Sequence, residues 1–313
     1  MPESANPLVE PDRLAAEWAR PDPPTLLDVR WRLSGPSGRG DHAAGHLPGA
    51  VFLDLDADLC GPPGPAGRHP LPDPDTLQAV LRAAGVRAGH PVVVYDGGDG
   101  MAAARAWWTL RWAGHRAVRV LHGGWPAWVG AGLPTDTDPP APTPGDVVVD
   151  PGGLPVLDPD QVVRLVNPSG GAQTDPSAGS QTDPVGGAQT DPARGAAPGV
   201  LLDVRAAARY RGETEPIDHV AGHVPGAVNL PATALVGADG RYPSTDDLRL
   251  RFAEAGVEPG RRVGAYCGSG VTAAQAVLAL HLAGRPDAAL YVGSWSNWIA
   301  DPGRPVATGP QPG

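Results

Sequence analysis

Residues 26–30 read LLDVR, and residues 201–205 repeat the same five letters. A second shared word follows each copy, GHLPGAV at 45–51 and GHVPGAV at 222–228. The words come in the same order in the two halves of the chain. Such ordered repetition indicates that the protein contains a duplicated domain.

Two further words extend the repeat. VVVYD at 92–96 is echoed by RVGAYC at 262–267, and GGWPAW at 123–128 is echoed by GSWSNW at 293–298. Four matches in one order make chance a poor explanation. A chain of 313 residues fits one large domain or two ordinary ones, and the repeat favours two.

Short apolar runs alternate with helical patterns in both halves. The predicted strands are residues 26–29, 91–95, 118–121 and 200–204, and the predicted helices are 74–84, 102–113, 159–166 and 273–283. This alternation predicts an α/β fold in which each domain is a mainly parallel sheet with helices on both faces. In such sheets, binding sites lie where strands end and helices begin.

The composition excludes some classes of partner. Gly (43 residues) and Pro (39) make up about a quarter of the chain, which is typical of disorder, but the hydrophobic fraction of 41% is enough for a core. The net charge is −10, and all 24 basic residues are Arg. This excess of acidic residues does not indicate a basic surface that would bind nucleic acid or an anionic membrane, so we expect neither as a partner.

The sequence also bears on the cellular compartment. The N-terminus carries acids and prolines where a signal peptide needs an apolar stretch. The longest nearly apolar run, residues 271–284, is too short to span a bilayer. Two cysteines, Cys60 and Cys267, cannot form a disulfide framework, which favours a reducing compartment. We therefore expect a cytoplasmic protein.

Two segments differ from the rest of the chain. The Pro-rich run at 134–155 is typical of a stiff, extended linker. Residues 167–199 contain QTDP three times and have no apolar periodicity, so we expect a disordered insert. A long insertion in a surface loop costs little closure entropy, which favours a neutral repeat expansion over a partner-binding role.

The chemistry converges on Cys267. This residue follows a predicted buried strand and opens the loop CGSGVT (267–272), which leads into a helix. Gly268 and Gly270 allow backbone N–H groups to turn inward as an anion-binding nest, and the helix N-terminus adds its positive end. Both effects favour the thiolate, which is the nucleophilic form. The alternative is a small buried structural cysteine, which fits a glycine-rich turn poorly.

The loop at 267–272, the paired GHxPGA words and the GxW endings resemble the tandem-domain rhodanese family of sulfurtransferases, and within it the 3-mercaptopyruvate sulfurtransferase branch. The resemblance implies two tandem rhodanese-like domains, which we place at 7–135 and 153–308 with a linker at 136–152. It also implies that the C-terminal domain is catalytic. Asp96 stands at the position that matches Cys267 and cannot carry a sulfane sulfur, so the N-terminal domain is predicted to be a degenerate copy.

The resemblance implies a ping-pong sulfurtransferase. The Cys267 thiolate would take sulfur from a small donor, 3-mercaptopyruvate or thiosulfate, and hold it as a persulfide. The acceptor would be cyanide or a thiol, such as a thioredoxin-like protein or a low-molecular-weight thiol. No metal or organic cofactor is implied. The residues of the loop expected to bind the donor are Gly268, Ser269, Gly270, Val271 and Thr272.

Asp56, His69 and Ser269 are similar in context to the family's Asp–His–Ser relay. A serine activated by a histidine that an aspartate orients can polarise a carbonyl or move a proton. Without the resemblance, His69 would be interpreted as a solvated loop histidine and Asp56 as a residue that caps backbone. Their catalytic roles therefore depend on the resemblance.

Arg209 matches the arginine with which the family holds the carboxylate of the donor, and a guanidinium fork suits that planar group. The alternative is a surface arginine that covers apolar area. The second arginine of the mercaptopyruvate branch falls near Asp218 here, which leaves the donor preference open. Thiosulfate-preferring relatives carry basic residues in the active loop, and this loop has none.

Residues that recur in the half without a nucleophile are predicted to be structural. His46 and His223 are expected to bond the backbone of a turn. Ion pairs are expected for Asp28 with Arg30 and for Asp203 with Arg205, and anchoring roles for Trp125 and Trp295. Cys60 lies in a Gly/Pro loop and is expected to be an incidental thiol, with a redox partner for Cys267 as the alternative.

Two rival functions remain. A cysteine-dependent phosphatase or arsenate reductase shares the strand–loop–helix logic, but position 273, where such loops carry an arginine that grips the oxyanion, is Ala273. A non-catalytic persulfide carrier or sulfide-sensing module is the other rival. The presence of Ser269, His69 and Arg209 argues against a mere carrier.

Overall fold

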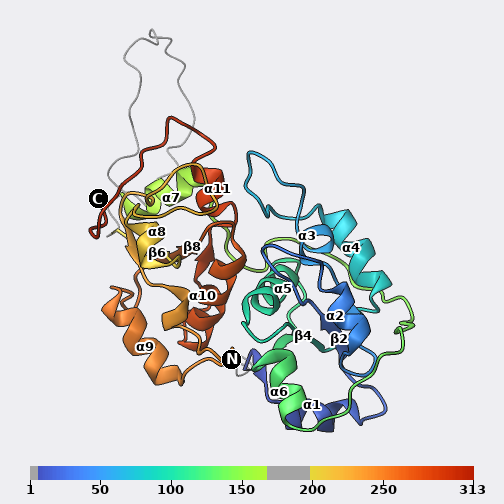
Figure 1. The fold of residues 1–313 in the computed structure, drawn as a ribbon. Coiled ribbons are helices and arrows are strands. Elements are labelled where there is room, and N and C mark those ends of the chain that lie inside the picture. The colour runs from blue at the N-terminus through green and yellow to red at the C-terminus, as the bar shows by residue number, and fades with distance from the viewer. Residues whose placement is uncertain (1–5, 168–197) are drawn as a thin grey trace, which may run out of the picture.

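The chain forms two α/β halves that lie side by side (Figure 1). This computed structural model describes residues 6–167 and 198–313. The predicted insert at 167–199 therefore lies, except for its ends, outside the described residues.

The N-terminal half holds a five-stranded sheet. Its strands are β1 (Leu8–Val9), β2 (Thr25–Asp28), β3 (Val51–Phe52), β4 (Val92–Tyr95) and β5 (Val118–Leu121). Its helices are α1 (Pro11–Trp18), α2 (Arg39–Ala44), α3 (Leu55–Asp58), α4 (Pro74–Ala83), α5 (Met101–Trp112) and α6 (Gly124–Gly130).

The C-terminal half holds a four-stranded sheet. Its strands are β6 (Val200–Asp203), β7 (Ala227–Asn229), β8 (Val263–Tyr266) and β9 (Ala289–Leu290). Its helices are α7 (Pro159–Val166), α8 (Ala207–Tyr210), α9 (Thr245–Glu254), α10 (Val271–Leu282) and α11 (Ser294–Trp298), with a 3₁₀ turn, η1, at Ala232–Ala234.

The four strands of the second sheet repeat the order of β3, β2, β4 and β5 in the first, and β1 has no counterpart. All described strand pairs are parallel, in the orders β1-β5-β4-β2-β3 and β7-β6-β8-β9. Asp28 pairs with Tyr95 in the first sheet, and Asp203 pairs with Tyr266 in the second. The sequence repeat thus corresponds to a structural repeat in the same register, which confirms the predicted α/β fold with two related sheets.

The halves share a core. Helices α5 and α10 pack against each other between the two sheets (Figure 1). Both are rich in alanine and buried on nearly every face, which explains why neither shows a polar stripe. Because each helix follows the carboxyl end of a central strand, the loops before α5 and α10 meet at the interface. There the Gln275 side chain donates to the Asp99 carbonyl at 2.6 Å.

Two predicted segments differ in detail from the structure. Helix α10 begins at Val271, two residues before the predicted start, because Gly270 caps it in a left-handed conformation with φ of +85°. The Pro-rich run contains no helix, yet it is attached to the first half. The Gly145 amide donates to the Arg82 carbonyl at 2.8 Å. The extended linker is therefore packed along part of its length.

The residues predicted to be structural take those roles in both halves. The Arg205 guanidinium binds Asp203 and the Gly222 carbonyl, and it lies 4.6 Å from the centre of the Trp295 ring. Arg30 makes the corresponding contacts with Asp28, the Gly45 carbonyl and the Trp125 ring. His46 Nδ1 and His223 Nδ1 each contact a backbone carbonyl at 2.8 Å. These parallel contacts confirm the structural predictions.

Within the part of the chain that the structure describes, no helix is both long enough and apolar enough to cross a membrane.

Candidate active site

Cys267 follows β8 directly and is 3% exposed. The Gly270 amide donates to its sulfur at 3.1 Å. A Cβ on Gly270 would lie 2.3 Å from the Val292 carbonyl oxygen, and φ is +85° there. Only glycine fits this position without strain. The sequence therefore folds locally into a turn that directs a backbone N–H at the thiol.

The segment at residues 294–295 holds the cysteine loop by hydrogen bonds to its backbone. The Cys267 amide donates to Ser294 Oγ at 3.1 Å, and the Cys267 carbonyl accepts from the Trp295 amide at 3.0 Å. Among the described residues other than glycine, Ser294 alone has a positive φ, 53°. A strained residue at a functional loop holds a geometry that the surrounding structure enforces. Ser294 was missed by the sequence reasoning, although the repeated word at 293–298 marked the segment.

The structure brings Asp56, His69 and Ser269 together across the interface. His69 Nδ1 lies 2.7 Å from Ser269 Oγ, and His69 Nε2 lies 3.0 Å from Asp56 Oδ1. The Trp31 indole N–H donates to both carboxylate oxygens of Asp56 at 3.0 Å. The C-terminal half thus supplies the hydroxyl, and the N-terminal half supplies the imidazole and the carboxylate.

Burial sets the protonation of His69. Desolvation lowers the pKa of its ring below 6.5; the nearby Asp56 opposes this, and Arg105 and Arg68 reinforce it. The ring is therefore neutral at pH 7. A carboxylate beside Nε2 favours the tautomer with the proton on Nε2, so Nδ1 accepts from the Ser269 hydroxyl. This arrangement fixes the position of the serine. The Asp56 side chain is 57% exposed, so water weakens its electrostatic effect.

Arg105 was not identified from the sequence. It is completely buried in α5, and its guanidinium donates to the Gly270 carbonyl at 3.3 Å and to the His69 carbonyl at 3.1 Å. No salt bridge to it is found in the described parts of the chain. One buried cation therefore connects the cysteine loop to the relay histidine. The signal in the sequence that could have revealed it is a single arginine within the otherwise apolar stretch at 101–108.

The second cysteine lies near this arginine. Cys60 is buried, and its sulfur is 3.8 Å from Arg105 Nη2. Burial raises the pKa of the Cys60 thiol above its ordinary value of 9.0, and Arg105 only partly offsets this. Both Cys60 and Cys267 are free thiols. Cys60 is therefore protonated at neutral pH and a poor nucleophile.

Arg209 does not present a free fork. Its guanidinium donates to Glu215 at 2.6 Å and to Asp218 at 3.1 Å. Burial would raise the pKa of Glu215, but the hydrogen bond from Arg209 holds it below its ordinary value. Arg68, which precedes the relay histidine, pairs with Asp218 from the other half of the chain. Arg68 was not identified from the sequence, where it stands beside His69 in a loop rich in glycine and proline.

A cavity of about 550 Å³ adjoins the thiol. Arg209, Gly268 and Thr272 line it together with Cys267, as do Asp99 and Met101 from the N-terminal half. The other predicted donor-binding residues, Ser269, Gly270 and Val271, are not part of this lining. Ser269 turns its hydroxyl away toward His69. The thiol therefore lies between a cavity on one side and the relay on the other.

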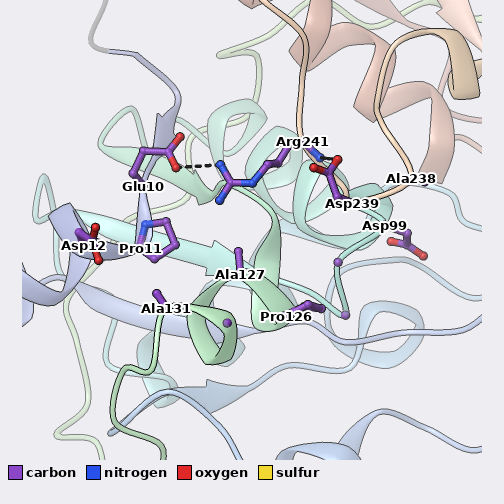
Figure 2. Close-up of a pocket in the computed structure, with 13 residues that line it drawn as sticks. Glu10, Pro11, Asp12, Asp99, Pro126, Ala127, Ala131, Ala238, Asp239 and Arg241 are labelled. Carbon is purple, nitrogen blue, oxygen red and sulfur yellow. Dashed lines mark hydrogen bonds and ion pairs between the residues drawn. The ribbon is translucent and has the colours of Figure 1, made fainter.

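Cys267 does not line the larger cavity of about 870 Å³, whose lining residues Figure 2 shows. Its charged lining residues are Glu10, Asp12, Asp99, Asp239 and Arg241. The Arg241 guanidinium is bound to Glu10 at 2.9 Å across this space. This mainly acidic lining disfavours an anionic ligand, and none of the described residues that line the cavity is a cysteine.

The N-terminal half contains the counterpart of the cysteine loop. Asp96 follows β4 as Cys267 follows β8, and its carboxylate accepts from the amides of Gly98 at 2.9 Å, Gly100 at 3.2 Å and Ala103 at 3.0 Å. Burial raises the pKa of Asp96 to about 6. The amide nest is thus occupied by a side chain of the protein itself. Across residues 6–167 and 198–313, no group of His, Cys, Asp or Glu could hold a metal ion.

The rhodanese-like domain family matches residues 10–131 and 190–301. The chain belongs to this family. A relative from Mycobacterium tuberculosis, provisionally named as the thiosulfate sulfurtransferase SseB, is 41% identical over 308 residues, which cover 96% of this chain and 97% of that protein. A Pseudomonas aeruginosa relative, provisionally named as a 3-mercaptopyruvate sulfurtransferase, is 43% identical over 307 residues, covering 96% and 98%.

The structural comparison agrees. The crystal structure of the 3-mercaptopyruvate sulfurtransferase SseA from Escherichia coli matches with a TM-score of 0.75 and 29% identity, covering 93% of this chain and all of that one. The chain therefore has two rhodanese domains and is a sulfurtransferase, which confirms the fold and the reaction class inferred from the sequence.

Proposed function

We propose that this chain transfers sulfur from 3-mercaptopyruvate through a persulfide on Cys267 to a thiol acceptor. The observation that carries the proposal is a buried thiol that receives the Gly270 N–H, with the Ser269–His69–Asp56 relay assembled beside it. A relay of this kind suits a donor with a ketone. Two of the compared relatives, from P. aeruginosa and E. coli, bear the name of this activity.

In the first half-reaction, the Cys267 thiolate attacks the sulfur of the donor. A sulfur–sulfur bond forms, the carbon–sulfur bond breaks, and its electron pair passes to the carbon to give the enolate of pyruvate. When the donor binds, the Ser269 hydroxyl rotates from His69 Nδ1 and donates its hydrogen to the ketone oxygen, where this negative charge builds up. The enolate then takes a proton and leaves as pyruvate, and the outer sulfur stays on Cys267 as a persulfide, stabilised by the loop amides.

In the second half-reaction, an acceptor thiolate attacks the outer sulfur. The sulfur–sulfur bond of the persulfide breaks, and its electron pair returns to Cys267, so that no external oxidant or reductant is needed. The cavity of about 550 Å³ beside Cys267 provides the access. A thioredoxin-like protein or a low-molecular-weight thiol is the proposed acceptor, and cyanide can take its place in an assay.

The proposal also assigns a different role to each half of the chain. The proposed limits are 7–135 for the N-terminal domain, 136–152 for the linker and 153–308 for the catalytic domain. Asp96 fills the nest of the N-terminal domain, which supports its being degenerate as a nucleophile centre. That domain instead contributes the relay residues. The proposed compartment is the cytoplasm.

Thiosulfate is the second candidate donor. The M. tuberculosis relative bears the name of that activity, and two guanidinium groups, of Arg68 and Arg209, lie near the loop. A dianion without a ketone would need these cations rather than the Ser269 hydroxyl. The third candidate, a non-catalytic persulfide carrier, would need no relay.

The test is steady-state kinetics with 3-mercaptopyruvate and thiosulfate as alternative donors and cyanide as the acceptor. We expect a higher kcat/KM with 3-mercaptopyruvate and no turnover in Cys267→Ser. A clear preference for thiosulfate would reject the donor assignment, and no transfer from either donor would favour the carrier. Hydrolysis of p-nitrophenyl phosphate that disappears in Cys267→Ser would instead identify a phosphatase.

A further inference from the structure

We propose that Arg68 binds the anionic donor together with Arg209, and that Asp218 sets how strongly this pair of arginines attracts it. The inference rests on the proposed function, because it concerns how the donor of that reaction is held. It makes the N-terminal domain a source of donor specificity as well as of the relay.

The position of Arg68 supports this role. A Cβ on Gly268 would lie 2.9 Å from Arg68 Nη2 and 3.6 Å from Arg209 Nη2, so both guanidinium groups lie against the residue that follows the nucleophile. The two arginines come from different halves of the chain and converge on Asp218, since Arg68 Nη2 is 3.4 Å and Arg209 Nη2 is 3.1 Å from its carboxylate. The loop that holds the nucleophile is thus flanked by one guanidinium group from each half of the chain.

The local charges explain why Asp218 matters. Two guanidinium groups and the carboxylates of Glu215 and Asp218 form a cluster with no net charge. The side chain of Asp218 is 4% exposed, whereas that of Arg68 is 28% exposed, so part of the arginine is open to solvent beside the cysteine loop. In this cluster the internal carboxylate competes with the carboxylate of the donor for the same N–H groups. Because the competition is electrostatic, removing the charge of Asp218 strengthens donor binding.

A purely structural role makes a different prediction. If the Arg68–Asp218 pair only held the two domains together, replacing either partner would change KM for the donor in the same direction. If Arg68 binds the donor, Arg68→Gln raises KM and Asp218→Asn lowers it. The opposite signs of the two effects separate the two roles.

The experiment measures KM and kcat for 3-mercaptopyruvate and for thiosulfate in both variants. Hydrogen bonds to charged groups contribute roughly 1.5–3 kcal/mol, so we expect Arg68→Gln to raise KM roughly tenfold or more, with kcat less affected. We expect Asp218→Asn to lower KM roughly threefold. The matched control is Arg241→Gln, which breaks an ion pair with Glu10 that also joins the two halves but lies away from the loop. It should leave KM unchanged.

Binding provides a second readout that does not depend on turnover. In the Cys267→Ala background, the dissociation constant of 3-mercaptopyruvate, measured by calorimetry, should rise with Arg68→Gln and fall with Asp218→Asn. An unchanged dissociation constant, or losses of the same sign in both variants, would overturn the role of Arg68. If the wild-type protein turns over neither donor, the proposed function fails instead, so the two failures are distinguishable.

Discussion

Replacing Gly270 with alanine tests whether the loop geometry activates the thiol. The new Cβ would lie 2.3 Å from the Val292 carbonyl oxygen and 3.0 Å from Arg105 Nη1, and φ is +85°. The carbonyl belongs to the backbone and cannot give way cheaply, so the loop must shift. The Gly270 N–H then moves away from the Cys267 sulfur, which it now contacts at 3.1 Å.

Two contributions to the effect can be separated. An alanine with positive φ costs about 1–2 kcal/mol of stability wherever it is placed. Losing a hydrogen bond to a charged sulfur costs a further 1.5–3 kcal/mol, roughly, in the reacting state. We therefore expect Gly270→Ala to lower kcat/KM by roughly 10- to 100-fold beyond any loss of folded protein.

The matched control is Gly49→Ala. Gly49 has φ of +76°, and a Cβ there would meet nothing within 4 Å, so it isolates the backbone cost. The assay combines denaturant unfolding with the initial rate of pyruvate formation from 3-mercaptopyruvate. If Gly270→Ala is destabilised like Gly49→Ala but keeps the wild-type kcat/KM, the directed amide is not part of the catalytic machinery and the reasoning fails.

Three further predictions concern other parts of the site and the core. Ser269→Ala should lower 3-mercaptopyruvate turnover by roughly 10²- to 10⁴-fold while thiosulfate turnover changes far less, and equal losses in steady-state assays would count against the relay. Arg105→Met removes the cation that holds the Gly270 and His69 carbonyls, so we expect kcat/KM to fall roughly tenfold. The unfolding free energy should change little, because the buried charge has no salt-bridge partner in the described structure. Unchanged kinetics would refute the positioning role. Burial, with nearby Arg111, lowers the pKa of His281 from 6.5 to about 4, so the folded protein binds fewer protons than the unfolded chain as the pH falls through this window. The wild type should therefore lose up to about 2 kcal/mol of stability from this group between pH 7.5 and pH 5. His281→Gln should reduce that loss in chemical denaturation, and an identical pH dependence in the two proteins would contradict the assignment.

Much of the fold was determined by local sequence. Near-continuous apolar strands such as residues 92–95 can be accommodated only in a parallel sheet covered on both faces, and the structure has such a sheet. The repeated sequence motifs were enough to predict the duplication, because the same motifs in the same order form strands that pair in the same register. The turn at 267–270 is also local, since its glycines permit the positive φ at Gly270 that directs an amide at the sulfur.

The assembly of the relay was not determined locally. Ser269 and His69 are 200 positions apart, and their contact at 2.7 Å exists only because α5 and α10 pack together between the two sheets. A family resemblance identified Asp56 and His69, whereas periodicity and spacing had nothing to distinguish them from surface residues.

The charges of the site were decided by the tertiary structure alone. The sequence could point to Arg209 as a carboxylate fork, but not to the two carboxylates that bind it or to Arg68, which approaches from the other domain. Burial of Arg105 without a carboxylate partner among the described residues was equally invisible. Local periodicity reports which face of an element is buried. The pairing of charged side chains depends on how the domains pack, because electrostatic interactions act through space rather than along the chain.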